Sequence, residues 1–366
     1  MKASEDCIRK IASSEVSTGI SRRSALKGLV VMSIAPTVMN QLAMAQAATT
    51  ALRPAPIAVE KLHHFGLRVT DVASSIAFYQ DIFGASLQDR HGDTAYLRIG
   101  GGPAFFSLSP VRGGEVPGIS HIGISVPDFN VDRLIAQLGE HGIREANVPA
   151  AEQGALESAL QTWKGGLNKA HVGSEDDLYF ADNEGLIYQL CSSTYCGSAS
   201  CQSLEPPTTT GFLQLVDINH FTNYMSHRVR ANQFMLELFG LEYQAYQGPN
   251  SPIVGVGDGK QFLMYVGGVE EGVPSQPGRI DHVSMSVTDF DVDSILNKLT
   301  TYGLRARENP SATPPLSHWI SMRMPNRGGA DEGTPELYFS DPDGLHMQLQ
   351  HVDYCGGGGY LGDVCD

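Results

Sequence analysis

The chain has few basic residues for its length. Lys and Arg number 25 against 40 Asp and Glu in 366 residues, which gives a formal net charge of −15 at pH 7. Surfaces that bind nucleic acid or anionic membranes carry an excess of positive charge. The composition therefore excludes nucleic acid as a partner. With 42% hydrophobic residues and 40 glycines, it is typical of a turn-rich globular protein with room for two domains.

Long apolar runs are also scarce. The main one extends from Gly28 to about Met44, and polar residues and a proline interrupt it. It is short for a membrane span, so a transmembrane anchor is the alternative and a cleaved export signal the main interpretation. The preceding segment 21–27 contains Arg22-Arg23 and resembles the twin-arginine export motif, with Ala25 where Phe is usual.

Two small-x-small cleavage patterns, at 43–45 and 45–47, end this run. We therefore expect residues 1–47 to be a signal peptide with its flank, and the mature chain to begin near residue 46 or 48. The predicted location is the periplasm or the medium, with no stable membrane insertion after cleavage.

Cysteine is infrequent, and its spacing does not match a zinc ribbon. An exported protein keeps disulfides, so we expect local bridges Cys196–Cys201 and Cys355–Cys365. Cys191 would remain free on a strand as a small apolar residue. The alternative pairing, Cys196–Cys355, would tie the two halves of the chain together.

The sequence does contain a fourfold internal repeat. Four β-prone segments open alike around a histidine, at 62–67, 119–124, 218–223 and 280–285. A helical pattern follows each. The first runs over 72–83 with Gly84 as its stop, and the third ends at Gly240. The second and fourth begin at Asp128 and Asp289, where Asp is a good N-cap, and end near 141 and 302.

The even units also close alike. Segments 177–190 and 336–349 share Leu-Tyr-Phe-x-Asp and a later glycine, and both continue to Tyr-Cys-Gly, a strand, turn and strand pattern. Units one and two then form one domain, 58–197, and units three and four another, 212–355. The Pro-containing segment 198–211 reads as a linker, and 356–366 as a Gly/Cys tail.

Paired strand–helix–strand units, a His in the first strand and the closing Leu-Tyr-Phe-x-Asp-Pro-x-Gly turn resemble the vicinal oxygen chelate superfamily. This superfamily holds glyoxalases, bleomycin-resistance proteins and extradiol dioxygenases. The resemblance covers nearly all of residues 60–355. It implies an α+β fold in which four βαβββ modules pair into two open-barrel domains, each curled around a metal site.

The resemblance also implies the metal ligands, one set for each domain. These are His64, His121 and Gln189 in the first domain, and His220, His282 and Gln348 in the second. The family's usual third ligand is Glu, so both copies depart from it. Two imidazoles with a carboxylate suit Fe(II) or Mn(II), whereas a Gln ligates only through its neutral carbonyl oxygen. The implied cofactor is a divalent metal, Fe(II) first, with Mn(II), Zn(II) or Ni(II) as other ions.

Strand periodicity separates the two domains. Alternate side chains share a face, so His346 should point inward with Gln348, as a ligand or an acid/base group. The alternative is a histidine hydrogen-bonded to a neighbouring strand. His63, one residue from a ligand position, should face away. The turn at 341–344 is closer to the family pattern than its counterpart, and we therefore expect the principal site in the second domain.

The other candidate side chains are expected to be ordinary. His171 and His318 lie in long insertions and read as surface loop. Tyr179 and Tyr338, in the closing motifs, read as packing residues.

The implied function is a metal-dependent enzyme that acts on a small organic substrate, first of all an extradiol-type ring-cleaving dioxygenase. A glyoxalase-like lyase or isomerase is the first alternative. A metal-free protein that sequesters a small molecule is the second. Loss of both Glu ligands favours the binding protein, and retention of all four histidines opposes it. Whether the chain forms a homo-oligomer stays open.

Overall fold

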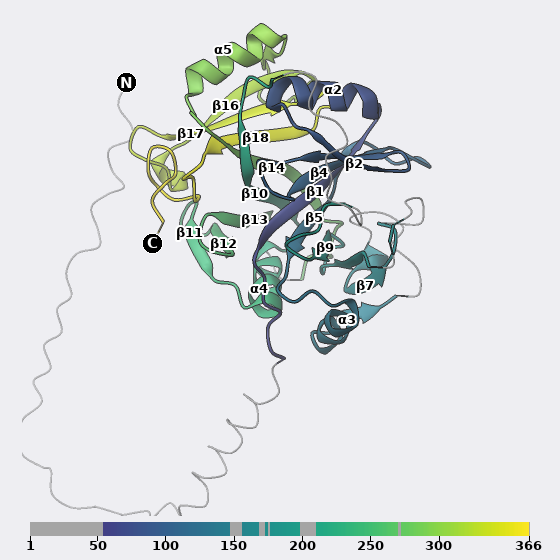
Figure 1. Cartoon of the computed structure of the whole chain (residues 1–366). Coiled ribbons are helices and arrows are strands. Elements are labelled where there is room, and N and C mark those ends of the chain that lie inside the picture. Colours follow the sequence, from purple (N-terminus) through teal and green to yellow (C-terminus); the bar gives the residue numbers. More distant parts are fainter. Residues whose placement is uncertain are drawn as a thin grey trace, which may run out of the picture. The chain divides into compact units, whose positions relative to one another are not determined.

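The computed structural model describes residues 54–146, 156–167, 173–174, 176–197, 210–269 and 272–365, and Pro54–Asp366 form one compact unit (Figure 1). The predicted signal peptide, His171, Cys201 and nearly all of the predicted linker lie outside the described residues. Among the helices of the described part, none combines the length and apolarity that a membrane crossing needs. The exact domain bounds and the export signal stay predictions.

The first sheet holds nine strands in the order β2-β3-β4-β1-β5-β9-β8-β7-β6. Its elements along the chain are β1 (Lys61–Val69), α2 (Val72–Phe83), β2 (Leu87–His91), β3 (Thr94–Arg98), β4 (Phe105–Pro110), β5 (Gly118–Ser125), α3 (Val131–Glu140), β6 (Arg144–Glu145), a 3-10 turn η1 (Leu156–Ser158), β7 (Gln161–Lys164), β8 (Leu178–Ala181) and β9 (Ile187–Cys191).

The second sheet repeats this order as β11-β12-β13-β10-β14-β18-β17-β16-β15. Its elements are β10 (Leu215–Met225), α4 (Arg228–Phe239), β11 (Tyr243–Tyr246), β12 (Pro252–Val256), β13 (Gln261–Gly267), β14 (Arg279–Val287), α5 (Val292–Tyr302), β15 (Arg305–Ala306), β16 (Ser317–Arg323), a 3-10 turn η2 (Pro325–Arg327), β17 (Thr334–Ser340) and β18 (His346–His351). We call residues 54–197 and 210–365 the first and second half.

The α+β fold with paired βαβββ units is confirmed. In each half the two opening strands pair antiparallel, β1 with β5 and β10 with β14. Each opening strand also pairs in parallel with the last strand of its own unit, as β5 does with β9 and β14 with β18. The even units carry one further strand of two residues, β6 or β15, at the sheet edge. This topology brings the middles of the opening and closing strands side by side.

The helix boundaries show where sequence reasoning was imprecise. Helix α2 ends at Gly84 in the left-handed conformation, as predicted, with φ of 62°. The prediction that Asp128 and Asp289 cap the even helices was wrong, because both lie in a turn before the helix with φ near 50°. The caps are Asn130 and Asp291, whose side chains accept from backbone N–H groups three residues on.

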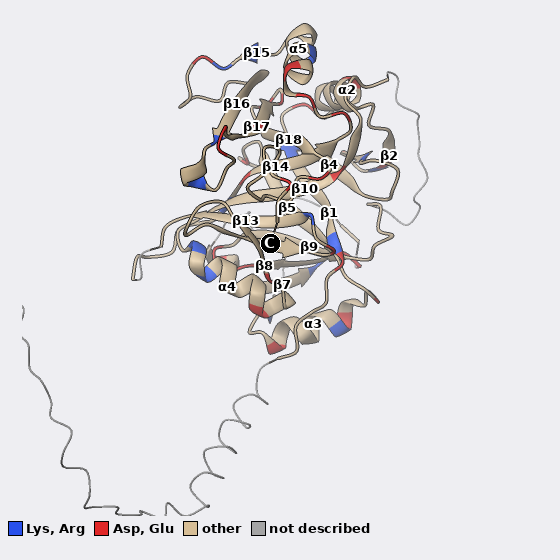
Figure 2. Ribbon diagram, turned by 90° about the vertical axis from the view of Figure 1, so that its left-hand side faces the viewer, with Lys and Arg blue, Asp and Glu red and all other residues tan. Residues whose placement is uncertain are grey.

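One hydrophobic core extends through both halves. The rings of Phe65 and Phe221, on the two opening strands, meet edge to face at 5.9 Å between centroids. Helix α2 reaches the other sheet, where Phe78 lies 6.1 Å from Phe339. Burying each such ring contributes about 2 kcal/mol. Figure 2 shows the acidic and basic residues mainly on helices, loops and strand ends, which leaves the sheet interiors for apolar packing.

The cysteines follow the local pattern where the structure describes them. Cys355 and Cys365 form a disulfide, as predicted, so the alternative bridge between Cys196 and Cys355 was wrong. Cys196 is disulfide-bonded, while its predicted partner lies outside the described residues. Cys191 is free and buried.

Candidate metal centre

The four opening strands hold their histidines in the same way. In every case the imidazole Nδ1 contacts the side chain of the residue immediately before it. The pairs are His63–His64 at 3.2 Å, Ser120–His121 at 3.0 Å, Asn219–His220 at 2.7 Å and Asp281–His282 at 2.9 Å. A partner on one ring nitrogen sets the ring orientation and leaves the other nitrogen to bind a metal or a substrate.

A strand irregularity accompanies each of these four contacts. The pairing of β1 with β5 shifts register between Leu62 and His64 and again at Ser120, and that of β10 with β14 shifts between Ile218 and His220 and again at Asp281. The extra residue in each bulge does not follow the simple alternation of a strand. The prediction that His63 faces away was therefore wrong, because period-two reasoning assumes an unbroken ladder.

In the second half the tautomers of both histidines follow from their partners. Asn219 donates from Nδ2 to the carbonyl of Tyr354 at 2.7 Å, so its Oδ1 faces His220 and accepts a hydrogen from Nδ1. The Asp281 carboxylate likewise accepts from Nδ1 of His282. Both Nε2 atoms therefore carry a lone pair, which is the form that ligates metal. The two rings are 5.8 Å apart between centroids.

Gln348 completes this group. It lies on β18 beside Ser284 of β14, and its Oε1 is buried with no hydrogen-bond partner among the described residues. Burial and the neighbouring His282 lower the pKa of His220, and the Gln348 side chain acts in the opposite direction. An unsatisfied buried carbonyl oxygen costs about 1–3 kcal/mol unless a ligand satisfies it. The second half thus supplies two imidazole nitrogens and one free oxygen, which fits a divalent ion.

An aspartate that sequence reasoning missed lies between His346 and this group of side chains. His346 pairs with His282 across β14 and β18. The Asp281 carboxylate lies 2.9 Å from Nδ1 of His282 and 3.9 Å from Nδ1 of His346. Burial raises the pKa of Asp281, but these histidines and Arg279 outweigh it and hold the pKa below its ordinary value. The sequence did carry a signal for this aspartate, because an acidic residue directly precedes the fourth histidine.

A buried ion pair engages the carboxylate of Glu336 on β17, the strand next to that of Gln348. Arg323 is fully buried and donates to Glu336 Oε1 at 3.2 Å and to the carbonyls of Gly328 and Gly357 at 2.8 Å each. Burial raises the pKa of Glu336, and Arg323 opposes that shift. The carboxylate is therefore engaged by the guanidinium.

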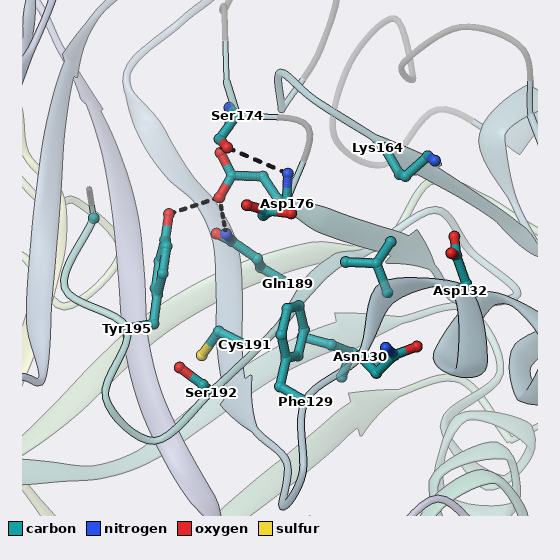
Figure 3. Close-up of a pocket in the computed structure, with 14 residues that line it drawn as sticks. Phe129, Asn130, Asp132, Lys164, Ser174, Asp176, Gln189, Cys191, Ser192 and Tyr195 are labelled. Carbon is teal, nitrogen blue, oxygen red and sulfur yellow. Dashed lines mark hydrogen bonds between the residues drawn. The ribbon is translucent and has the colours of Figure 1, made fainter. Parts of the chain in front are cut away.

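The first half arranges the equivalent side chains differently. Asp177, at the position of Glu336, accepts from Gln189 Nε2 at 3.1 Å and from the Tyr195 hydroxyl at 2.8 Å (Figure 3). This fixes the Gln189 amide with its Oε1 toward His64, whose Nε2 donates at 2.9 Å. The two atoms that would face an ion are thus bonded to each other, so His64, His121 and Gln189 do not present three free donors.

Small residues accompany this difference. A Cβ on Gly123 would lie 2.1 to 2.4 Å from ring atoms of His64, so the imidazole occupies the space of a side chain. The equivalent residue of the second half is Ser284, which pairs with Gln348 across the strands. The ring of His64 therefore occupies space that the side chain of Ser284 fills at the equivalent position of the second half.

A second group of donors surrounds His64. The Cys191 sulfur lies 3.8 Å from Nδ1 of His64, and His63 lies on the same side. One donor atom from each of these buried residues lies within 4.8 Å of the other two. These three side chains can hold a metal ion. Cys191 and Gln189 share a face because they are two residues apart on β9, whereas the bulge at His63 had no sequence signal.

The first half also contains cavities. One of about 600 Å³ is lined by Gln189, Cys191 and Tyr195, which Figure 3 shows beside one another. Another, of about 390 Å³, is lined by His121 and by the aromatic rings Tyr96, Phe105, Tyr179 and Tyr195.

The remaining residues named from the sequence have structural contacts. The prediction that His318 lies in a surface loop was wrong, because it is a buried residue of β16. Its side chain bonds to that of Thr300 at 2.8 Å, and burial lowers its pKa. Tyr179 and Tyr338 are packed edge to face on His121 and His282 at 5.8 and 5.2 Å. They are packing residues, as predicted, but what they pack against is the histidines.

Comparisons with known proteins agree with this architecture. Residues 61–158 match the sequence model of the Glyoxalase/Bleomycin resistance protein/Dioxygenase superfamily. Among the curated proteins, none matches the chain significantly.

Several solved structures share the fold at low identity. One is homoprotocatechuate 2,3-dioxygenase from Brevibacterium fuscum, in complex with 3,4-dihydroxyphenylacetate, with 18% identity, 81% of each chain covered and a TM-score of 0.54. The 2,3-dioxygenase LapB from Pseudomonas sp. KL28 matches over 84% of this chain and 99% of its own, with 15% identity and a TM-score of 0.53. The Mn(II)-bound glyoxalase from Novosphingobium aromaticivorans covers 83% of each chain, with 16% identity and a TM-score of 0.51. The chain therefore has the two-domain fold of the extradiol dioxygenases, with residues 61–158 matched to the glyoxalase, bleomycin resistance and dioxygenase superfamily.

Proposed function

We propose that the protein is a metal-dependent enzyme acting on a small aromatic diol, of the extradiol ring-cleaving kind, with its metal in the second half. The supporting observation is the set of free donor atoms there: Nε2 of His220, Nε2 of His282 and the unpartnered Oε1 of Gln348. Dioxygenases that share the fold act on such diols, one of them in complex with 3,4-dihydroxyphenylacetate.

The residues of the site have separate roles in this proposal. His220, His282 and Gln348 hold the ion, and Asp281 keeps His282 in the ligating tautomer. When bound, a divalent ion such as Fe(II) or Mn(II) supplies open coordination positions and redox chemistry. His346, with a quarter of its side chain exposed, would take a proton from a substrate hydroxyl.

The test uses the full chain purified without oxygen, loaded with Fe(II), and supplied with 3,4-dihydroxyphenylacetate and O₂. The wild type should consume O₂ and form the ring-opened product. His282→Ala should lose both the iron and the activity, whereas the matched variant His121→Ala should keep both. Equal iron content and turnover in the two variants would contradict the placement in the second half.

Two other activities have supporting observations. The likeness to a Mn(II)-bound glyoxalase supports a lyase or isomerase, which would turn over a hemithioacetal rather than the diol on the same variants. The aromatic cavity around His121 supports metal-free binding of a small molecule. That function would appear as ligand affinity that survives both metal removal and His282→Ala.

The export prediction also remains a proposal, because residues 1–47 lie outside the described part. Arg22→Lys with Arg23→Lys should leave the precursor in the cytoplasm. Unchanged export of the double variant would contradict the twin-arginine interpretation.

A further inference from the structure

We propose that His63, His64 and Cys191 form a second metal site, distinct from the proposed centre of the second half, and that it binds one Cu(I) ion. The three side chains are almost completely inaccessible, with relative exposures of 0%, 0% and 2%. They come from two strands of the first sheet, β1 and β9.

The distances suit a metal bound by two nitrogens and one sulfur. A first-row ion takes nitrogen at about 2.0 Å and sulfur at about 2.3 Å, which places two nitrogens about 3.3 Å apart and a nitrogen and a sulfur about 3.6 Å apart. The observed separations are 3.2 Å between the two Nδ1 atoms and 3.8 Å from Nδ1 of His64 to Sγ of Cys191. The third separation is within 4.8 Å, so only the sulfur and His63 must move closer, by about 1 Å.

The surroundings orient His64 for this site. Its Nε2 donates to Gln189, which Asp177 holds in turn, so its Nδ1 carries the lone pair. A hydrogen bond of this kind behind a ligating imidazole is the usual support of a metal site. The ring lies directly over Gly123, where any side chain would displace it.

His63 is available as the second nitrogen ligand. Its Nδ1 lies 3.2 Å from Nδ1 of His64, so an ion bound between the two rings would replace this contact. Its side chain is completely buried, which disfavours the charged imidazolium. Neutral imidazole is the form that binds metal.

Charge and coordination number select the ion. Cu(I) binding replaces the Cys191 thiol proton, which passes to solvent, and a Cu(I)–thiolate pair with two neutral imidazoles carries no net charge. A divalent ion would leave one positive charge in a dry site, which is costly. The cluster offers three donors among the described residues, whereas structural zinc takes four. Soft thiolate ligands select Cu(I).

The cavity of about 600 Å³ provides a route for the ion. Cys191 and Gln189 line it, and Figure 3 shows both on its wall with Tyr195. The second half lacks this site, because Asn219 stands in place of His63 and Gln350 in place of Cys191.

The test titrates Cu(I) into the full chain without oxygen against a chromophoric Cu(I) chelator. We compare the wild type with Cys191→Ser and with His63→Asn, which copies the second half and can still bond to His64. Losing a supporting residue around a metal costs about 10–100-fold in affinity, so each variant should bind Cu(I) at least about 100-fold more weakly. His141→Asn, at a more accessible histidine, should retain wild-type affinity.

X-ray absorption of the wild-type copper complex identifies the atoms bound to copper without the use of a variant. It should show one sulfur at about 2.2–2.3 Å with nitrogen neighbours. Copper without a sulfur neighbour, or wild-type affinity in both Cys191→Ser and His63→Asn, would overturn the proposal. His282→Ala should leave Cu(I) binding unchanged, so failure of the iron centre and failure of this site are separate results.

Discussion

The two halves hold equivalent side chains in two different hydrogen-bonded states. In the second half, Arg323 engages the carboxylate of Glu336, and the buried Oε1 of Gln348, whose side chain lies beside His220, has no hydrogen-bond partner among the described residues. Among the described residues of the first half, no arginine bonds to Asp177, and that carboxylate accepts from the amide of Gln189 instead. Gln189 then occupies Nε2 of His64, the nitrogen equivalent to the one that His220 would offer a divalent ion.

The difference shows that ligand identity does not by itself determine a metal site. Both halves present two histidines and a glutamine at the positions that the family resemblance assigns. The carboxylate one strand away decides which of the donor atoms stay free. The duplicated unit thus supports a proposed divalent site in one half and a different, thiolate-containing proposal in the other.

The largest expected effect comes from removing Arg323. Arg323→Met would leave the buried Glu336 carboxylate and two glycine carbonyls unpaired, and breaking a buried pair costs about 3–5 kcal/mol. Denaturant unfolding should show that loss. Adding Glu336→Gln should recover part of it.

The control is Arg305→Met, at an exposed arginine of the same half, which should change the free energy of unfolding by less than about 0.5 kcal/mol. A loss in Arg323→Met as small as this would mean that the pair does not hold the second half together.

The second effect is a pH dependence at the closing turns. Burial raises the pKa of Asp182 to about 7 and that of Asp341 to about 6. The Tyr79 hydroxyl donates to Asp341 at 3.0 Å, whereas Tyr188 lies 3.4 Å from Asp182, which agrees with the smaller shift in the second half. Below about pH 3 both carboxyl groups are protonated in the folded and in the unfolded state, and the stability that they contribute is fully present.

As the pH rises from about 4 to 7, the folded state binds more protons than the unfolded state, so stability is lost. Asp182 should account for at most about 4 kcal/mol of this loss, and Asp341 for about 3 kcal/mol. The free energy of unfolding of Asp182→Asn, relative to that of the wild type, should therefore increase between about pH 4.5 and 7.5, as measured by denaturant unfolding. A gap between variant and wild type that does not change with pH would refute the assignment.

Sequence patterns predicted the repeat, the strand order within units and the positions of the four histidines, because hydrophobic periodicity and turn residues are local signals. They could not predict the hydrogen-bond states of Gln189 and Gln348. The state of Gln189 depends on Asp177, just before β8, and in the second half Arg323 of β16 engages the equivalent Glu336. Nor could they predict His63, because a bulge changes the side-chain direction without a mark in the sequence.

The third effect tests the position of the His64 ring. Gly123→Ala would place a methyl group where the imidazole now lies, and such overpacking costs about 1–3 kcal/mol. The reciprocal change, Ser284→Gly, only opens space in the second half and should cost less, about 0.5–1 kcal/mol. Thermal unfolding of both variants measures the contrast. Equal losses of stability in the two variants would mean that the rings of His64 and His220 have the same packing.

The smallest expected effect distinguishes the two glutamines directly. Gln348→Glu would place a carboxylate beside Nε2 of His220 and His282, and should tighten binding of a divalent ion by about tenfold, or about 1.4 kcal/mol. Gln189→Glu would instead set a second carboxylate against Asp177, at a contact that is now 3.1 Å, and should destabilise the fold without a gain in affinity. Isothermal titration of Mn(II) into both metal-free variants measures the affinities. Tighter binding in Gln189→Glu alone would move the divalent site to the first half and reverse the comparison.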